Sequence, residues 1–263
     1  MSAPGRSEDR VALDVTLSGN IAHVLLKGPG KGNALGPDFW REAPAVFDEI
    51  DADPAVRAVV LSGIGANFSY GLDLMAMTSE LRYALAAPAM AAERTRFLDQ
   101  ISAMQRAVTS LLSCRKPVVA SISGWCVGAG LDIVCAADVR VCSSDAIFSA
   151  RAVRIGIVED MGSLQRLPVI IGEGAARELC LTGEDFGAAR AAQLLARDLG
   201  SARLLSLLAL REAGGLAGLG ERRRCELALA RAHSLYGQGP RDADPDWMSF
   251  FGEAELAGLE AQA

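Results

Sequence analysis

The chain has 263 residues, of which 51% are hydrophobic, so it can bury a sizeable core and global disorder is excluded. Its net charge at pH 7 is −6 and it contains no basic tract, which argues against a nucleic acid as its main partner. No apolar run reaches the length of a membrane span, so membrane insertion is not expected.

Two features favour a cytoplasmic location. The first ten residues are small or charged and lack the apolar centre of a signal peptide, so a flexible N-terminus is expected over 1–10. The six cysteines show no CxxC spacing and most lie in apolar segments, which indicates reduced thiols in the core. No metal site is expected from these residues.

The first third of the chain combines strand and helix patterns. Alternating apolar and polar residues predict two strands joined by a tight turn, and a run of Val and Leu predicts a later, buried strand. Apolar residues at helical spacing predict helices between and after them. The expected order is strands 11–17 and 21–26, helix 37–50, strand 57–62 and a helical stretch from 72 to 77.

The middle of the chain repeats this alternation. A helix is predicted at 93–112, where five apolar residues recur at helical spacing, and the apolar run 117–122 predicts a central strand. Residues 79–92 carry no clear pattern. The remaining expected elements are a helix at 131–137, a strand at 139–142, and short helices at 163–171, 174–181 and 188–196.

The composition changes near residue 197, after which Leu, Ala and Arg dominate. A helical part is expected there, interrupted at Gly214 and Gly215, with a loop at 242–247 and a last helix at 248–263. The expected domain organisation is therefore a core over 11–196 and a helical C-terminal part over 197–263.

The stretch from Gly128 to Asp132 is the first candidate for chemistry. It follows the strand at 117–122 and opens a helix through small residues. The first N–H groups of a helix have no partner within the helix and form an electropositive cup. Such a cup can stabilise an oxyanion, and Asp132 places a carboxylate in the first turn.

A second glycine-containing loop (68–74) and a second acidic site (Glu159 and Asp160) add to this pattern. The only histidines are His23, in a predicted strand, and His233, in the C-terminal part. A nucleophilic triad that depends on histidine is therefore not expected. Carboxylates and backbone N–H groups are the available catalytic groups.

Seven stretches in this order resemble the crotonase (enoyl-CoA hydratase/isomerase) superfamily. Each is weak alone, but together they extend over residues 11 to about 190. They are residues 31–35, 57–63, 68–75, 116–120, 128–133, 137–140 and 162–168. Within the superfamily the sequence looks most like the Δ3,5-Δ2,4-dienoyl-CoA isomerases, because of residues 71–75, Asp132, and Asp160 shortly before Gly162.

The resemblance implies a fold, a ligand and an assembly. The fold is an α/β spiral of ββα turns with two steeply angled sheets and helices outside. The ligand is an acyl-CoA thioester, so coenzyme A is part of the substrate and no separate cofactor is expected. The implied assembly is a homotrimer or a dimer of trimers.

The resemblance also assigns binding residues. The backbone N–H groups of Leu72 and Ala129 should meet the thioester oxygen. The CoA site should be lined by residues of both loops and of the stretch after Gly30, with Lys31 as a phosphate contact and Asp73 more suited to capping a local helix. These residues are Lys31, Asn33, Ala34, Leu35, Tyr70, Gly71, Leu72, Asp73, Leu74, Gly128, Ala129 and Gly130.

The acid–base residues depart from the family pattern. Hydratases of the family hold a water between two carboxylates, which align with Asp132 and with Ala152. Dienoyl isomerases have a Glu at that second position and shuttle a proton between it and an Asp that aligns with Asp160. The sequence therefore retains Asp132 and Asp160, with Glu159 as a candidate second carboxylate. Apolar neighbours should raise the pKa of Asp160.

Three functions follow from the resemblance together with these residues. The first is double-bond isomerisation of a dienoyl- or enoyl-CoA in fatty-acid metabolism, with Asp160 moving the proton and Asp132 assisting. The second is hydration of an enoyl-CoA by Asp132 with an unusual partner such as Glu159. The third, motivated by Ala152 and the divergent C-terminal part, is acyl-CoA binding without catalysis.

Overall fold

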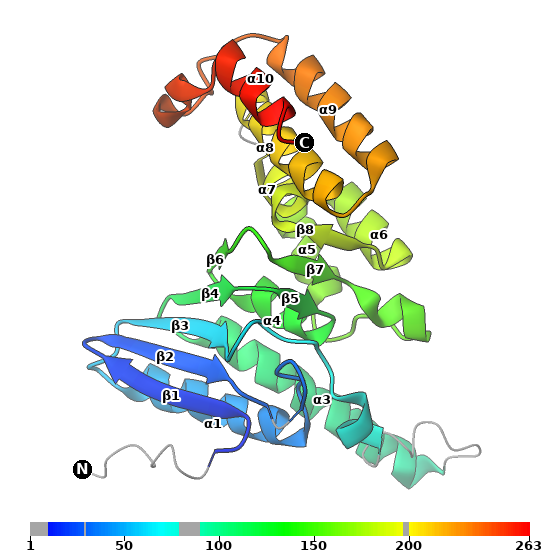
Figure 1. The fold of residues 1–263 in the computed structure, drawn as a ribbon. Coiled ribbons are helices and arrows are strands. Elements are labelled where there is room, and N and C mark those ends of the chain that lie inside the picture. The colour runs from blue at the N-terminus through cyan, green and yellow to red at the C-terminus, as the bar shows by residue number, and fades with distance from the viewer. Residues whose placement is uncertain (1–9, 29, 79–89, 197–199) are drawn as a thin grey trace. The chain divides into compact units, whose positions relative to one another are not determined.

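The computed structural model describes residues 10–28, 30–78, 90–196 and 200–263. The chain forms two compact units, Met1–Asp185 and Phe186–Ala263 (Figure 1). The first unit ends before the boundary expected at residue 196. All residues predicted to carry chemistry belong to the first unit.

A five-stranded sheet organises the first unit. Its order is β1-β2-β3-β4-β6, with β1 antiparallel to β2 and the other pairs parallel. Alternate residues such as Val24, Leu61 and Ala120 are buried and lie in register across neighbouring strands. The strands are Leu13–Ser18, Ile21–Leu26, Ala58–Gly63, Val118–Ile122 and Val139–Cys142.

The structure also contains a smaller sheet of three short strands, which was not predicted. Its strands are β5 (Trp125–Val127), β7 (Ile147–Ser149) and β8 (Asp185–Gly187), in that order. Strands of three residues are too short to show a period of two. Because β4 is followed by β5 and β6 by β7, successive turns of the chain add one strand to each sheet. This is the ββα spiral that the resemblance implied.

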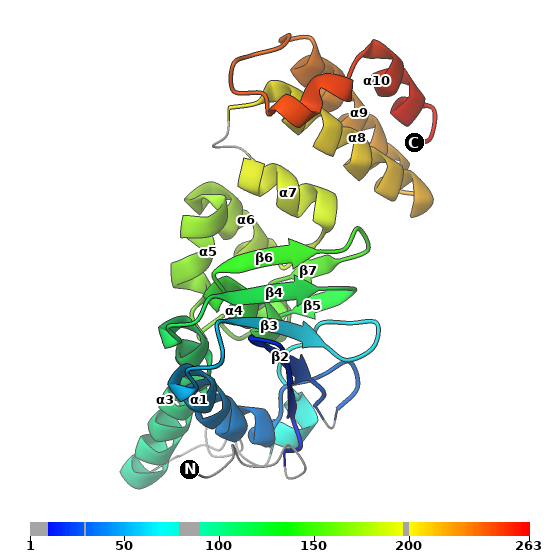
Figure 2. The ribbon, with the colours of Figure 1, turned by 90° about the vertical axis from the view of Figure 1, so that its left-hand side faces the viewer.

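Helices α1 (Pro37–Ala52) and α3 (Ala91–Ser113) pack against each other and lie on one side of the five-stranded sheet (Figure 2). Pro37 is the first residue of α1, where its missing N–H is tolerated, and the helix continues through Pro44. The buried Glu42 of α1 accepts hydrogen bonds from the N–H groups of Val11, Ala12 and Leu13 at 2.8–3.1 Å. These bonds fix the start of β1 on the helix.

The rest of the first unit is a series of short helices. Helix α4 (Ala129–Ala136) is buried along its whole length, as its apolar composition requires. It is followed, after β6 and β7, by a 3-10 helix η2 (Arg151–Ile155), which was not predicted, and by α5 (Ser163–Ile171) and α6 (Glu173–Thr182). Helix α4 packs against both α3 and α5.

The second unit is helical, as expected, but two details of the prediction were wrong. Helix α8 (Ala202–Gly218) runs through Gly214 and Gly215 without a break. Each glycine costs about 1 kcal/mol in a helix, and burial of the neighbouring Ala213 and Leu216 against α9 offsets this cost. The expected loop and last helix are a 3-10 helix η4 (Asp246–Phe250) and α10 (Glu253–Glu260). The other helices are α7 (Ala188–Ala196) and α9 (Arg222–Tyr236).

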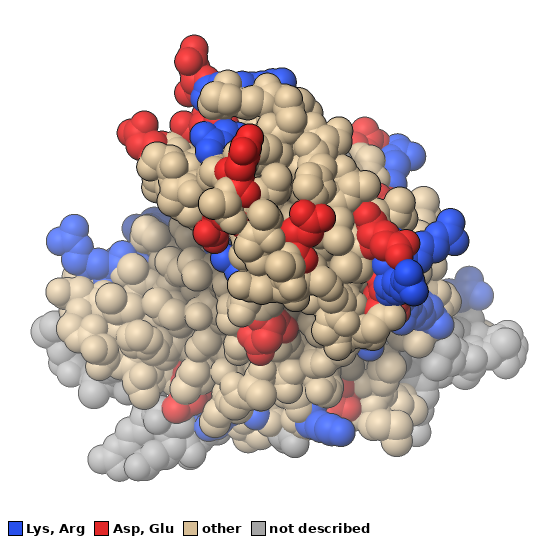
Figure 3. All heavy atoms as spheres, turned by 45° about the horizontal axis from the view of Figure 1, so that its top comes forward, with Lys and Arg blue, Asp and Glu red and all other residues tan. Residues whose placement is uncertain are grey.

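Surface charge, helix hydrophobicity and cysteine exposure can be compared with the expectations from the sequence. On the face of the molecule in Figure 3, acidic and basic side chains both occur and neither sign covers the face. None of the helices that the structure describes is both long enough and apolar enough to cross a membrane. The six cysteines are free thiols, and Cys142 is exposed, so the expectation that the cysteines are core residues was wrong for this one.

Candidate active site

A cavity of about 250 Å³ in the first unit is lined by about half of the site residues predicted from the sequence. Its wall is largely apolar and includes Trp40 of α1 and Met104 of α3. Both glycine-containing loops, residue 152 and three carboxylates reach it. Of the predicted site residues and residue 152, those that line it are Leu72, Leu74, Gly128, Ala129, Asp132, Ala152, Glu159 and Asp160.

The two glycine-containing loops touch each other at this cavity. Ser69 pairs with Cys126 as an isolated parallel bridge, in which the N–H of Ser69 donates to Trp125 O (3.0 Å) and Val127 N–H donates to Ser69 O (2.9 Å). Gly71 has a φ of +82°, and a Cβ at this position would lie 2.5 Å from Val127 O and 3.2 Å from Ala129 N. The close approach of the loops therefore requires glycine at residue 71.

Leu72 and Ala129, the two predicted oxyanion donors, both line the cavity. Leu35 pairs with Leu72 through the two residues that flank Leu72. The N–H of Leu35 donates to Gly71 O (2.7 Å), and the carbonyl of Leu35 accepts from Asp73 N–H (3.0 Å). No hydrogen bond among the described residues uses the N–H of Leu72 or of Ala129. Ala129 is the first residue of α4, so its N–H has no partner in the helix.

The residues predicted to line the CoA site divide into groups with different roles. The side chain of Asn33, at φ +56°, donates to the carbonyl groups of Ile64, Asn67 and Phe68 at 2.8–3.2 Å, and Leu35 is buried. Both residues therefore hold the loops together. Ala34 is half-buried, and Lys31 is exposed, as a phosphate contact would need to be.

Tyr70, Asp73 and Gly130 also have structural partners. The Tyr70 ring lies over Gly32, where a Cβ would be 2.5 Å from the ring. Asp73 Oδ1 accepts the N–H of Ala76 (2.9 Å), which confirms the predicted helix cap. Gly130 packs on Ser69, 3.0 Å from the place of its missing Cβ. Small residues here let the helix start approach the neighbouring loop.

Asp132 is buried in the first turn of α4 and is 2% exposed. Its Oδ1 accepts the N–H of Ser163 at 2.7 Å, so it satisfies the first N–H of α5. Burial raises the pKa of Asp132, and the hydrogen bonds from Ser163 act in the opposite direction. The carboxylate therefore joins two helix starts at the cavity wall.

Glu159 is buried beside Asp132, and the sequence did not show this. Its Oε1 accepts the N–H of Ala152 (3.4 Å) and its Oε2 accepts the hydroxyl of Ser163 (3.3 Å). Burial and the negative charge of Asp132 raise the pKa of Glu159 to about 7. Two adjacent carboxyl groups that share partners hold a proton between them near neutral pH.

The side chain of Asp160 is exposed and also lines the cavity. Partial burial raises the pKa of Asp160, the direction expected from its apolar neighbours. Its carbonyl accepts a hydrogen bond from the side chain of Gln105 in α3 (2.9 Å), which fixes the backbone of this turn. The structure thus brings Asp132, Glu159 and Asp160 to one cavity, with the first two buried and the third open to solvent.

The raised pKa of Glu159 should make stability depend on pH. An unfolded Glu loses its proton near pH 4.5, whereas folded Glu159 keeps it to about pH 7, so the free energy of unfolding should fall as pH rises through this window. Glu159→Gln should reduce this fall and stabilise the protein at pH 7.5 by about 1–3 kcal/mol. Urea unfolding at pH 5 and 7.5 measures it, with exposed Glu184→Gln as the control. Parallel pH curves for the native protein and Glu159→Gln would contradict it.

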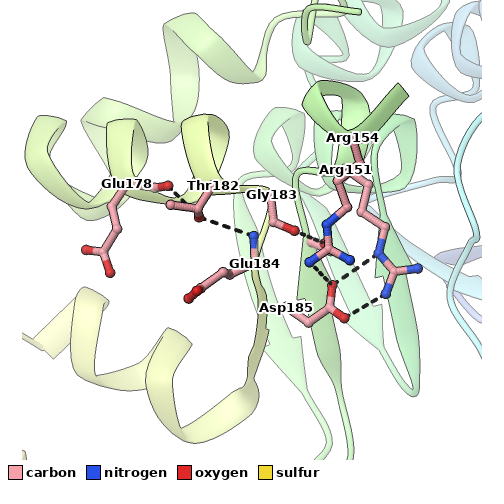
Figure 4. A network of polar contacts seen from close by, with 8 residues as sticks. Arg151, Arg154, Glu178, Thr182, Gly183, Glu184 and Asp185 are labelled. Carbon is pink, nitrogen blue, oxygen red and sulfur yellow. Dashed lines mark hydrogen bonds and ion pairs between the residues drawn. The ribbon is translucent and has the colours of Figure 1, made fainter. Parts of the chain in front are cut away.

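An ion-pair network holds the segment that carries Ala152 (Figure 4). Arg151 donates through Nε to Asp185 Oδ1 (3.1 Å) and through Nη2 to Oδ2 (2.7 Å), and Arg154 Nη2 lies 3.9 Å from Oδ1. The Arg151 guanidinium also lies 4.7 Å above the centre of the Trp125 ring. Partial burial raises the pKa of Asp185, but the hydrogen bonds and positive charges of these arginines lower it more, so the pKa lies below its ordinary value. The network fixes η2 against the neighbouring strands at the cavity.

Trp40 and Ser163 belong to the site but were not singled out from the sequence. Trp40 lines the cavity, and its Nε1 is the one buried side-chain N or O atom without a hydrogen-bond partner among the described residues. Ser163 contacts both buried carboxylates. A single tryptophan in a helix and a serine at a helix start are common in cores and at helix ends, so neither carries a signal in the sequence.

The chain is similar to solved structures over most of its length. An enoyl-CoA hydratase/carnithine racemase from Magnetospirillum magneticum is 27% identical, covers 94% of this chain and 85% of its own, and superposes with a TM-score of 0.62. A Thermobifida fusca YX protein described as an enoyl-CoA hydratase, in complex with CoA, is 26% identical, with 90% and 99% covered and a TM-score of 0.62.

Curated relatives match about three fifths of the chain in sequence. The peroxisomal Δ3,5-Δ2,4-dienoyl-CoA isomerase of Arabidopsis thaliana is 39% identical over 167 residues, which are 64% of this chain and 60% of the relative. The mitochondrial enzyme of Mus musculus is 44% identical over 154 residues, 58% of this chain and 46% of the relative. The chain thus spans about half the length of these relatives. The family model described as Enoyl-CoA hydratase/isomerase matches residues 16–194. The chain therefore belongs to the enoyl-CoA hydratase/isomerase family.

Proposed function

We propose that this protein isomerises a double bond in a dienoyl- or enoyl-CoA through a thioester enolate, as part of fatty-acid metabolism. The observation that carries the proposal is one cavity lined by three carboxylates and by two residues, Leu72 and Ala129, whose N–H groups have no hydrogen-bond partner in the described part of the chain. The relatives named dienoyl-CoA isomerases support the reaction, and the CoA complex of a similar structure supports the ligand. Coenzyme A enters as part of the substrate, and no further cofactor is required.

The chemistry needs an oxyanion site and groups that move a proton. Removal of a proton from a carbon near the thioester places negative charge on the carbonyl oxygen. Two N–H groups aimed at that oxygen stabilise the enolate, each by about 3 kcal/mol in comparable sites. Asp160 takes the proton, because its exposed carboxylate can reach substrate and solvent, and Asp132 assists from the buried wall. Return of a proton at another carbon completes the shift.

Hydration of an enoyl-CoA is the alternative, and the adjacency of Asp132 and Glu159 favours it. Hydration needs two carboxylates at one water, and these side chains share Ser163 as a hydrogen-bond partner. Acyl-CoA binding without turnover remains an outcome of the experiment.

Turnover of a 3,5-dienoyl-CoA, followed by the absorbance of the conjugated product, tests the proposal. The native protein should isomerise it, and Asp160→Asn should lower kcat at least ~100-fold, because proton transfer by a positioned group contributes that much. Crotonyl-CoA is assayed in parallel for hydration. Turnover insensitive to Asp160→Asn would remove Asp160 from the mechanism, hydration alone would favour the alternative, and CoA binding without either reaction would favour a binding protein.

Assembly and location complete the proposal. The family resemblance supports a homotrimer or dimer of trimers, and the edge strand β6 exposes Val139 and Val141. A cytoplasmic location is the prediction from the sequence. The relatives above carry peroxisomal and mitochondrial names and do not support it. Sedimentation of the purified protein measures the assembly.

A further inference from the structure

We propose that Glu159 supplies the carboxyl group that residue 152 lacks and that it delivers the proton to the acyl chain as the partner of Asp160. This inference rests on the proposed function and assigns the second proton-transfer group of the same cavity. Glu159 lies seven residues after Ala152, the residue whose missing carboxyl group it would supply.

The position of Glu159 is the first support. Its Oε1 accepts the backbone N–H of Ala152 at 3.4 Å, so the carboxyl group folds back onto the residue whose methyl group cannot transfer a proton. Both residues line the cavity, and the Glu159 side chain is 6% exposed. The turn that returns the chain contains Gly156 at φ +73°, a conformation that glycine adopts without strain.

The orientation of Glu159 is the second support. Ser163 donates its hydroxyl to Glu159 Oε2 (3.3 Å) and its N–H to Asp132 Oδ1 (2.7 Å). One residue at the start of α5 therefore positions both carboxyl groups. Because Ser163 is fully buried and belongs to a helix, the pair is held by a rigid element.

The division of roles follows from exposure. Glu159 is buried beside Asp132 and shares Ser163 with it as a hydrogen-bond partner, and the repulsion between two carboxylates keeps a proton on the pair. Asp160 is adjacent in sequence, but its side chain is exposed, so it can exchange its proton with solvent. Glu159 therefore serves as the proton donor and Asp160 as the proton acceptor.

The step balances in protons and electrons. Asp160 removes a proton from a carbon next to the thioester carbonyl, the C–H electron pair enters the conjugated system, and negative charge rests on the thioester oxygen at Leu72 and Ala129. Neutral Glu159 then donates its proton to the far carbon of the conjugated system, where a new C–H bond forms. Asp160 ends protonated and Glu159 ends as a carboxylate, and exchange with water restores both.

The sharpest test removes the carboxyl group at residue 159 and then introduces one at residue 152. Glu159→Ala should lower kcat for a 3,5-dienoyl-CoA at least ~100-fold. Adding Ala152→Glu to Glu159→Ala, which returns a carboxyl group to the same wall, should recover at least ~10-fold of this loss. Glu184→Gln, which removes an exposed charge outside the cavity, is the control. Acyl-CoA binding and thermal unfolding of each variant show that it is folded.

Infrared spectroscopy separates this inference from the proposed function. The native protein should show the carbonyl stretch of a protonated carboxyl group that titrates near pH 7, and Glu159→Gln should lack it. A native protein without turnover would refute the proposed function, and the proton delivery with it, while the infrared band would still decide whether the pair holds a proton. Turnover of Glu159→Ala within ~3-fold of native, or no such band in the native protein, would overturn the role of Glu159.

Discussion

Ala129→Pro is expected to lower kcat by about 10²–10³-fold while the protein stays folded. The loss is what removal of one oxyanion donor costs in comparable sites, about 3–4 kcal/mol. The fold should tolerate the change because Ala129 is the first residue of α4, where proline is favourable, and its N–H has no partner among the described residues.

The preceding residue also accommodates proline. Gly128 has φ 50° and ψ −118°, the mirror image of the extended conformation that residues before proline prefer, and glycine adopts both hands. Steady-state kinetics with a 3,5-dienoyl-CoA measures the effect. Ala129→Gly is the matched variant: it keeps the N–H, so it should lose less than about tenfold. If folded Ala129→Pro turned over within tenfold of native, this N–H would have no part in catalysis.

Gly71→Ala should destabilise the protein by about 2 kcal/mol more than Gly65→Ala. Both residues have a positive φ, +82° and +75°, so both variants carry the cost of a left-handed alanine, about 1–2 kcal/mol. At Gly65 a Cβ meets nothing within 4 Å, whereas at Gly71 it lies 2.5 Å from Val127 O. The backbone must move to relieve that overlap, which adds the cost of overpacking.

Urea unfolding measures this difference, and kinetics gives a second readout. Because the movement occurs between the N–H groups of Leu72 and Ala129, Gly71→Ala should also lower kcat, while Gly65→Ala should not. Equal stabilities for the two variants would mean that the loops do not approach as closely as the structure shows.

The sequence by itself determined the elements with a clear period and the motifs with a fixed spacing. The strands of the larger sheet and helices α1 and α3 were predicted because their apolar residues repeat over enough positions to reveal a period. The two glycine-containing loops were found because a helix start and a tight turn need particular small residues. Their meeting at one cavity was expected only from the family resemblance.

Only the tertiary structure decided which carboxylate is buried. Glu159 and Asp160 are neighbours with the same chemistry. The family resemblance singled out Asp160, but no pattern in the sequence showed which of the two side chains is buried. The turn after η2 and the start of α5 direct Glu159 toward Asp132 and Ser163 and leave Asp160 exposed. The three-residue strands β5 and β7 were also missed, since their pairing depends on strands from other turns of the spiral. Burial and pairing depend on residues distant in sequence, and these decided how the acidic groups of this site are arranged.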